Sequence, residues 1–286
     1  MKTKKHLSAG MVVVYAILTL WALTTIYPIF WIVINSFKAK NEILANSFSL
    51  PLGGLFTTSN YETAFERLNI FSAYRNSLLI SCTVSVVVVL LAGMASFAIV
   101  RYSFKLKKFL YSLVIAGMMF PVFATIIPVF RMLNAVHMAN TDNLLLSLIS
   151  VALPQIAGNL SFAIVVLSGY IKSLPIELEE AAYMEGCNAF QIFFKVIVPL
   201  TKPSFATVAI FSFLWSYNDL FTQMFLLRLP EQRAITRLLN ELTSMEGTNY
   251  GLMAAAVALV VIPVIIVYII LQKHIIKGMT AGAVKG

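Results

Sequence analysis

The sequence predicts an all-α protein that crosses a membrane six times. Apolar residues make up 59% of the 286 residues, charged residues only 12%, and the mean hydropathy is +0.86. A soluble domain carries about 45–50% apolar and about 25% charged residues, so this much apolar surface cannot be hidden in one globular core. The apolar residues gather in long stretches, and most of the basic residues lie on one side of them. Lipid is therefore the expected solvent for most of the chain.

Six apolar stretches follow one another along the chain, each of about 20 residues or more, the length that spans a bilayer as a helix. They cover approximately residues 11–36, 75–100, 109–133, 144–171, 204–228 and 252–272. The second is rich in valine, which favours strands in water, but a helix is expected in lipid because it satisfies its own backbone hydrogen bonds. Prolines remove a backbone donor, so kinks are expected at Pro28, Pro121, Pro128, Pro154 and Pro263.

The distribution of charge predicts which side of the membrane each loop faces. The N-terminus, residues 101–108, residues 172–203 and the C-terminus hold 13 of the 21 Lys and Arg residues and four acids, which accounts for the entire net charge of +9. Because Lys and Arg accumulate in cytoplasmic loops, both termini are expected in the cytoplasm. Residues 37–74 and 229–251 are then outer loops, and residues 1–286 form a single transmembrane domain.

The sequence argues against several functional classes. A basic chain can bind nucleic acid, but here the excess charge borders the apolar spans, so topology explains it. No nucleophile–base pair or metal-ligand cluster is apparent, and His6, His137 and His274 are scattered near span ends, so neither a catalytic site nor a metal site is expected. The sequence also lacks the Gly-x-x-x-x-Gly-Lys-[Ser/Thr] loop that cradles nucleotide phosphates.

The cytoplasmic loop 172–203 is the most informative segment of the chain. Its first part predicts a short helix, because Glu177, Glu179 and Glu180 favour the positive end of a helix dipole. Gly186 suits the end of that helix. The loop is long for a simple connector.

A second short helix is expected directly after the glycine. Asn188 followed by Gln191 predicts a capping box, and Pro199 is expected to end the helix. The pair Ala181-Ala182 leaves a flat face on the first helix that could enter a groove of another protein.

These residues resemble the coupling-loop signature of ATP-binding-cassette (ABC) importer permeases, which have the type I importer architecture. The shared pattern is Glu180-Ala181-Ala182, then Gly186, and Pro199 thirteen residues after the glycine. The chain departs from the family pattern at Glu185, where Asp is usual, and at Cys187, where Ala is usual.

The resemblance implies that this loop sits in a cleft of a separate ATPase subunit and moves when ATP closes the ATPase dimer. The ATPase-coupling positions that carry over are Glu180, Ala181, Ala182, Glu185 and Gly186. ATP and Mg are then bound by the partner ATPase, and this chain binds no cofactor itself.

Three further stretches resemble the carbohydrate branch of the family, close to the smaller permease of maltose-type importers: Tyr27-Pro28 with Asn35-Ser36-Phe37-Lys38, residues 76–81, and residues 277–286. The resemblance implies a second homologous permease, two ATP-binding subunits, a sugar substrate and an extracytoplasmic sugar-binding protein that receives the outer loop 229–251. It implies the cytoplasmic membrane of a bacterium or archaeon as the location. It also implies that the tail reaches between the ATPase subunits, through Gly282, Ala283, Val284 and Lys285.

Polar and aromatic residues within the fourth and fifth spans are candidates for a sugar pathway. Polar groups are costly in lipid, so those inside spans usually face a cavity or a partner. Sugar sites combine aromatic faces with amide and carboxylate groups. The candidates are Gln155, Asn159, Trp215, Tyr217, Asn218, Asp219 and Gln223. For any single one of them, hydrogen bonding between helices is the simpler interpretation.

Two other interpretations stay open. An importer permease could carry a non-sugar cargo, although a cation would favour more acids in the spans than Asp219, and an anion would favour buried Arg or Lys near mid-span. A secondary carrier would use an ion gradient, but such carriers often show inverted repeats and several intramembrane ionisable groups, and this sequence shows neither.

Overall fold

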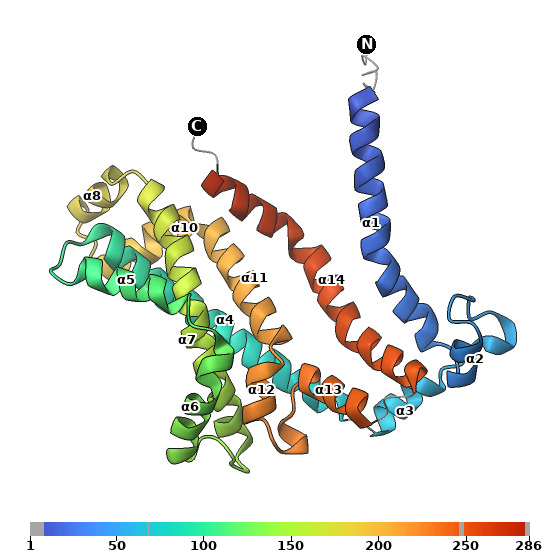
Figure 1. Ribbon diagram of the computed structural model, residues 1–286. Coiled ribbons are helices and arrows are strands. Elements are labelled where there is room, and N and C mark those ends of the chain that lie inside the picture. The colour runs from blue at the N-terminus through green and yellow to red at the C-terminus, as the bar shows by residue number, and fades with distance from the viewer. Residues whose placement is uncertain (1–8, 68, 246–248, 284–286) are drawn as a thin grey trace. The chain divides into compact units, whose positions relative to one another are not determined.

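The computed structural model describes residues 9–67, 69–245 and 249–283, and within these residues it contains helices and connecting loops but no strand (Figure 1). The predicted all-α class is therefore confirmed. The chain divides into two compact units, residues 1–68 with 239–264 and residues 69–238 with 265–286. The division falls inside two helices, α13 (Ile235–Met245) and α14 (Tyr250–Ala283).

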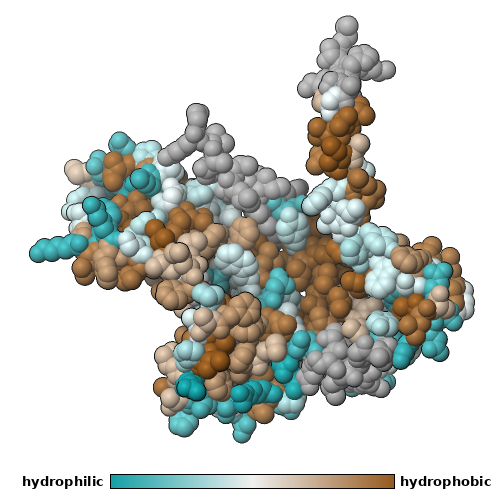
Figure 2. All heavy atoms as spheres, in the orientation of Figure 1, coloured by the Kyte–Doolittle hydropathy of each residue, from teal (hydrophilic) through white to brown (hydrophobic). Residues whose placement is uncertain are grey.

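The first unit begins with a long apolar helix and continues with short ones. These elements are α1 (Ala9–Ser36), α2 (Lys40–Ala45), the 3-10 turn η1 (Gly53–Leu55) and α3 (Ser59–Arg67). Large apolar side chains are exposed along most of α1, and Figure 2 shows hydrophobic surface on this helix. A helix that is apolar on all sides suits lipid or other apolar helices as its surroundings.

A fully buried lysine organises the loop that follows α1. Lys38 Nζ donates hydrogen bonds to the backbone carbonyls of Asn46 at 2.8 Å and Ser49 at 2.9 Å. Asn60 Nδ2 in turn donates to the Lys38 carbonyl at 2.8 Å. Burial lowers the pKa of Lys38 below its usual value, and the nearby Glu42 carboxylate partly opposes that shift. The loop and α3 are thereby fixed to the end of α1.

Three long helices form the core of the second unit. They are α4 (Ile70–Arg101), α7 (Leu144–Ser173) and α11 (Lys202–Asn218). Small hydroxyl side chains hold them together: Ser96 Oγ on α4 donates to the Ile164 carbonyl at 3.0 Å, and Ser85 Oγ donates to the Ala209 carbonyl at 2.7 Å. Small residues let helices in a membrane approach closely, and such hydrogen bonds add to their packing.

The remaining elements of the second unit connect these three helices. They are α5 (Lys107–Gly117), α6 (Val122–Ala135), α8 (Glu177–Met184), α9 (Ala189–Ile192), the π-helical turn η2 (Phe193–Ile197), α10 (Val198–Leu200), α12 (Phe221–Leu226) and the 3-10 turn η3 (Pro230–Gln232). Figure 1 shows α8 near one end of α7 and α6 near the other.

Four of the six predicted spans are single helices, and the third is not. The helices α1, α4, α7 and residues 250–270 of α14 are long and apolar enough to cross a bilayer. Where one kinked helix was predicted over 109–133, the structure has α5 and α6, bent by 104°. Pro121 is the N-cap of α6, and proline ends a helix because it donates no backbone hydrogen bond and restricts the residue before it. The other prolines predicted to kink the spans lie inside helices that continue past them: Pro28, Pro128, Pro154 and Pro263.

The fifth predicted span, 204–228, is also interrupted. The helix α11 ends at Asn218, and α12 begins after Asp219 and Leu220. Asp219 Oδ1 accepts a hydrogen bond from the Thr222 backbone amide at 3.0 Å, as a capping carboxylate does at the start of a helix. Asp219 therefore marks a break in the helix and does not lie inside a continuous span.

Candidate functional site

The first helix of the loop 172–203 ends at a left-handed glycine, as predicted. The Gly186 amide donates to the Tyr183 carbonyl at 2.9 Å, and the Cys187 amide donates to the Ala182 carbonyl at 3.0 Å. Gly186 has a φ of +82°, which glycine adopts without the steric cost of a Cβ. This pair of bonds around a glycine satisfies the last carbonyls of α8 and turns the chain toward the second helix.

The second helix begins at the predicted cap but does not end at the predicted proline. Asn188 Oδ1 accepts from the Gln191 amide at 3.0 Å, and Gln191 Oε1 accepts from the Asn188 amide at 2.9 Å. Pro199 lies inside α10, and helical structure continues to Leu200. The π-helical turn η2 lies directly before α10, where the proline would interrupt a regular α-helical ladder because it lacks an N–H.

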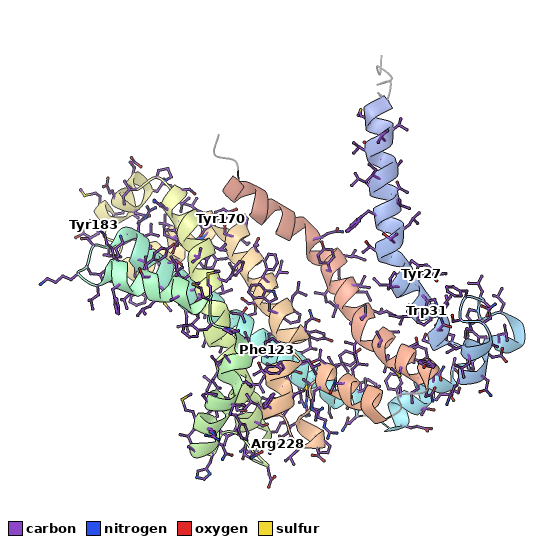
Figure 3. All side chains as sticks on the ribbon, in the orientation of Figure 1. Tyr27, Trp31, Phe123, Tyr170, Tyr183 and Arg228 are labelled. Atoms are coloured by element: carbon purple, nitrogen blue, oxygen red, sulfur yellow. The ribbon has the colours of Figure 1, made fainter. Side chains whose placement is uncertain are left out.

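The predicted ATPase-coupling positions lie on an exposed face of this loop. Glu180, Ala181, Glu185 and Gly186 are exposed, and Ala182 is half-buried. Large apolar side chains beside them are also exposed: Tyr183 at 70%, Met184 at 84% and Phe190 at 69%. Figure 3 shows Tyr183 at the end of the fold where α8 lies. Apolar side chains exposed together suit a contact with another protein or with the membrane.

One acidic residue of α8 lies on the buried side of that helix. Glu179 is 8% exposed, and its Oε1 accepts a hydrogen bond from Arg101 Nε at 2.6 Å. Arg101 Nη2 also donates to the Leu174 carbonyl at 3.0 Å. From the sequence, Glu179 was expected only to stabilise the start of the helix through its dipole. The sequence does not distinguish it from Glu177 and Glu180, because it does not show which side of α8 is buried.

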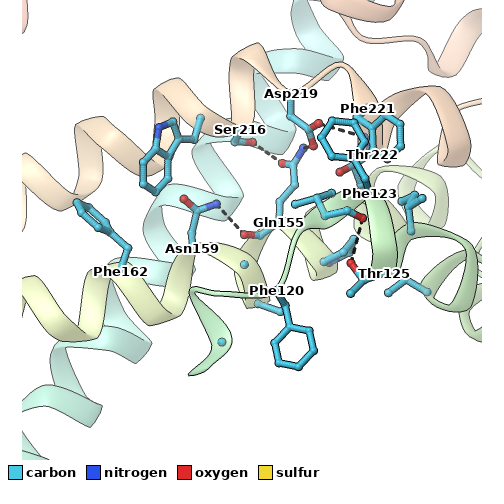
Figure 4. Close-up of a pocket in the computed structure, with 18 of the residues that line it drawn as sticks. Phe120, Phe123, Thr125, Gln155, Asn159, Phe162, Ser216, Asp219, Phe221 and Thr222 are labelled. Carbon is cyan, nitrogen blue, oxygen red and sulfur yellow. Dashed lines mark hydrogen bonds between the residues drawn. The ribbon is translucent and has the colours of Figure 1, made fainter. Parts of the chain in front are cut away.

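A pocket of about 850 Å³ opens where the α5–α6 break, the middle of α7 and the end of α11 meet (Figure 4). Cavities of this size hold small-molecule ligands. Five of the candidate pathway residues line it: Gln155, Asn159, Trp215, Asn218 and Asp219. Much of its apolar wall comes from residues that the sequence analysis did not single out: Met118, Phe120, Phe123, Phe162 and Phe221.

A hydrogen-bonded network fixes the polar side of the pocket. Gln155 Nε2 donates to Asp219 Oδ2 at 2.6 Å, and Ser216 Oγ donates to Gln155 Oε1 at 2.6 Å. With the Thr222 amide on Asp219 Oδ1, both carboxylate oxygens of Asp219 have partners within the chain. The network holds α7 against the end of α11 and orients these polar groups at the pocket wall.

Asn159, which lines the same pocket, has a buried side-chain oxygen without a partner among the described residues. Its Nδ2 donates to the Gln155 carbonyl at 2.7 Å, while its Oδ1 has no hydrogen-bond partner among the described residues. The side chain lines the pocket and is only 8% exposed. The Phe162 and Trp215 rings line the same pocket, with centroids 5.0 Å apart. An unpaired amide oxygen in a pocket with aromatic faces suits a ligand that carries both hydroxyl groups and an apolar ring face.

Two candidate pathway residues lie away from the pocket. Tyr217 is 4% exposed, and Gln223 is fully buried. Gln223 Oε1 accepts a hydrogen bond from Thr236 Oγ1 at 2.6 Å. This contact fits the alternative interpretation for Gln223, hydrogen bonding between segments of the permease.

The beginning of the segment 229–251, the predicted outer loop, is anchored by buried polar contacts. Asn76 Nδ2 donates to the Glu231 carbonyl at 2.9 Å, and the Ile235 amide donates to Ser77 Oγ at 2.8 Å. Asn76 and Ser77 are fully buried on α4. This part of the loop is therefore a fixed extension of the helical core.

The predicted tail residues fall at the edge of what the structure describes. Gly282 and Ala283 are the last residues of α14, and Val284 and Lys285 lie outside the described residues. Their contact with an ATPase stays a prediction.

The sequence and the fold also match known proteins. Residues 88–281 match the family described as binding-protein-dependent transport system inner membrane component. The chain belongs to this family. The resemblance to ABC importer permeases is thereby confirmed. The matched region includes both the exposed loop 172–203 and every residue that lines the pocket.

The relatives of the permease include two named for carbohydrate transport. It is 33% identical over 274 residues to a putative ABC transporter permease of Caldicellulosiruptor sp. strain Rt8B.4, covering 95% of this chain and 96% of the relative. It is 32% identical to the diacetylchitobiose uptake system permease of Streptomyces coelicolor, covering 94% of this chain and 87% of that relative. It is 31% identical to the galactooligosaccharides transport system permease of Bacillus subtilis, covering 95% and 94%.

A solved structure shares the fold of the permease. It is the crystal structure of a bacterial ABC transporter involved in the import of the acidic polysaccharide alginate, matched with a TM-score of 0.75 and 26% identity over 92% of this chain and 95% of that chain. The permease is therefore a multi-pass, noncatalytic membrane subunit of a binding-protein-dependent ABC transporter, which works with an ATPase and a substrate-binding protein.

Proposed function

We propose that the permease carries a neutral sugar or oligosaccharide across the cytoplasmic membrane of a bacterium or archaeon. The observation that carries this proposal is the lining of the pocket, which combines Asn159, with its buried and unpartnered Oδ1, and the Gln155–Asp219 network with the Phe162 and Trp215 rings. Sugars present hydroxyl groups at their edges and an apolar face on the ring, so they need both kinds of contact. The names of the relatives, which include permeases for diacetylchitobiose and galactooligosaccharides, point the same way.

The charge of the pocket favours a neutral sugar over an acidic one. No Lys or Arg is among the described residues that line the pocket, and Asp219 supplies a carboxylate to its wall. A uronate ring would bring a second negative charge into a site of low dielectric, which is unfavourable without a basic partner. In this respect the proposed cargo differs from the alginate imported by the transporter of similar fold.

In this proposal residues 1–286 act as one permease domain with six spans, both termini in the cytoplasm. The bent pair of residues 107–135 supports a further span when it counts as one crossing. In the bent pair of residues 189–218, the crossing part is α11, because residues 189–200 belong to the cytoplasmic loop. The charge asymmetry supports the orientation, because the segments 101–108 and 172–203 are rich in Lys and Arg.

In this proposal, the loop 172–203 couples ATP hydrolysis in the partner subunit to changes at the pocket. Its exposed face, with Glu180, Ala181, Ala182, Glu185 and Gly186, docks on an ATPase subunit that binds ATP and Mg. The exposed apolar side chains around that face support this role, because they have no cover within the described part of the chain.

The complete transporter contains this permease, a second homologous permease, two ATP-binding subunits and an extracytoplasmic sugar-binding protein. The outer loop 229–251 contacts the binding protein, and the tail at residues 282–285 reaches between the ATPase subunits. The exposed apolar surface of α1 supports contact with a second permease or with lipid.

Co-purification followed by ATPase assays tests this function. The permease is purified in mild detergent with its partner chains, and ATP hydrolysis is measured with the binding protein and neutral oligosaccharides. Stimulation by a neutral oligosaccharide, and not by a uronate oligosaccharide of equal length, is the expected result. The absence of an ATPase or second permease in the complex, with no stimulation by any sugar, would contradict the proposal.

A further inference from the structure

A buried ion pair joins α4 to the start of the loop 172–203. Arg101 Nε and Glu179 Oε1 lie 2.6 Å apart, with side chains only 10% and 9% exposed. Arg101 stands in the last turn of α4, and Glu179 in the first turn of α8. Removing one partner of a buried pair leaves an uncompensated charge, so the pair strongly favours one arrangement of the two helices.

Aromatic contacts join the second part of the loop to the same helix. The Phe193 ring in η2 lies 5.7 Å from the Phe97 ring on α4, measured between centroids. A Cβ placed on Gly93 of α4 would lie only 3.1 Å from the Phe193 ring and 2.7 Å from the Phe205 ring. The close approach therefore depends on the glycine. The end of α4 contacts the loop on both sides of Gly186.

The exposed face that is proposed to dock on the ATPase and the buried ion pair lie on different sides of α8. Glu180 and Ala181 are exposed, while the neighbouring Glu179 is buried against Arg101. A partner that moves α8 through its exposed face therefore acts directly on the buried pair. The helix α4 in turn packs along both α7 and α11, which carry most of the polar wall of the pocket.

We propose that Arg101 and Glu179 are positioning residues that transmit movement of α8 to α4, so that ATPase closure and rearrangement of the pocket occur together. This inference rests on the proposed docking of the loop 172–203 on an ATPase. It predicts that loss of the pair leaves ATP hydrolysis running while less sugar is moved for each ATP consumed.

A double-mutant cycle on the complete transporter tests the pair. Arg101→Met and Glu179→Gln each remove one charge and keep most of the side-chain volume, and the two changes are also combined. ATP hydrolysed per sugar transported is measured for the complex in proteoliposomes. We expect each single variant to raise this ratio about 10-fold and the double variant to raise it by about the same factor, because residues in direct contact are not additive. Glu177→Gln, an exposed residue in the same turn of α8, is the control and leaves the ratio unchanged.

Several outcomes would overturn the inference. It fails if the single variants keep the wild-type ratio, or if the double variant shows about the product of the single effects, roughly 100-fold. It also fails if the variants reduce assembly of the complex by as much as they reduce transport, since the pair is then structural only. Arg101→Lys, which keeps the charge, is expected to remain nearer to the wild-type ratio than Arg101→Met. Wild-type complex without sugar-stimulated ATP hydrolysis would instead contradict the proposed function itself.

Discussion

Gln155 Nε2 donates a hydrogen bond to Asp219 Oδ2 at 2.6 Å, and this contact joins the middle of α7 to the break between α11 and α12. The carboxylate also caps α12 through the Thr222 amide. One acidic side chain thus holds the helix break in place and supplies a hydrogen-bond acceptor at the wall of the pocket. The same network orients Gln155, because Ser216 Oγ donates a hydrogen bond to its Oε1 atom.

Asp219→Ala is expected to reduce transport more than membrane abundance. The substitution leaves Gln155 Nε2 and the Thr222 amide without their acceptor, so the pocket wall loses its fixed geometry. Loss of a helix cap costs about 1 kcal/mol and an unsatisfied buried donor about 1–3 kcal/mol, together less than the stability of about 5–15 kcal/mol that is typical of a folded protein. Sugar uptake is measured together with the amount of permease in the membrane. Equal losses of uptake and abundance would make Asp219 a structural residue only.

Asn159→Leu is expected to weaken the response of the ATPase to sugar. Leucine has a similar size but removes the buried, unpartnered Oδ1 of this pocket-lining residue, together with the Nδ2 hydrogen bond to the Gln155 carbonyl. Losing one hydrogen bond of about 1 kcal/mol raises the sugar concentration for half-maximal stimulation about 5- to 10-fold. The matched control is Ser168→Ala, a buried residue on α7 outside the pocket. An unchanged sugar response in Asn159→Leu, or an equal change in Ser168→Ala, would remove Asn159 from the proposed site.

Gly186→Val is expected to leave membrane insertion intact and to uncouple transport. The glycine has φ +82°, so valine strains the turn, and its side chain extends from the exposed docking face. Gly186→Asn separates the two causes, since asparagine tolerates the left-handed conformation. If docking needs the bare backbone, both variants lower sugar-dependent ATP hydrolysis. Transport at the normal rate in Gly186→Val would show that the docking assignment is wrong.

Gly93→Ala is expected to destabilise the permease, unlike the same change at Gly169. A Cβ at Gly93 would lie 2.7 Å from the Phe205 ring, which forces the buried aromatic cluster to shift and costs about 1–3 kcal/mol. Apart from the adjoining residues and backbone of α7, no atom of the described residues lies within 4 Å of a Cβ placed at Gly169, so alanine there gains up to about 1 kcal/mol of helix propensity. Thermal unfolding in detergent measures both. A Gly93→Ala variant as stable as Gly169→Ala would contradict the close packing of α4 on Phe205.

The sequence predicted the class of the fold and the turn within the loop 172–203 because both depend on local signals. Apolar stretches of membrane-spanning length identify most of the long helices, and Gly186 with the Asn188–Gln191 box identifies where the loop turns. These features involve residues that are close in the sequence. Their geometry is therefore set mainly by local backbone preferences, which can be inferred from a single sequence.

The same local signals did not predict the breaks in the third and fifth spans. Pro121 indicated a kink, but proline is tolerated inside α6, α7 and α14 in this structure, so a proline alone does not predict a bend of 104°. The aromatic wall of the pocket was missed as a consequence, because Phe120 and Phe123 reach it only through that break. Phe123 also packs against Phe221, with ring centroids 4.3 Å apart, a contact between segments far apart in the sequence.

The role of Glu179 shows a second limit. A hydrophobic pattern tells which face of a long helix is buried, but α8 has only eight residues and three neighbouring acids in its first turn. The partner Arg101 lies at the end of another helix. Only the three-dimensional packing of α4 against the loop distinguishes Glu179 from Glu180.

The most direct test of the account is uptake of a labelled neutral oligosaccharide into proteoliposomes that contain the complete transporter and its binding protein. Uptake that requires hydrolysable ATP on the ATPase side, and that is abolished by omitting the ATPase while an ion gradient is present, is the predicted result. Uptake driven by an ion gradient without the ATPase would contradict the account, because the permease would then be a secondary carrier.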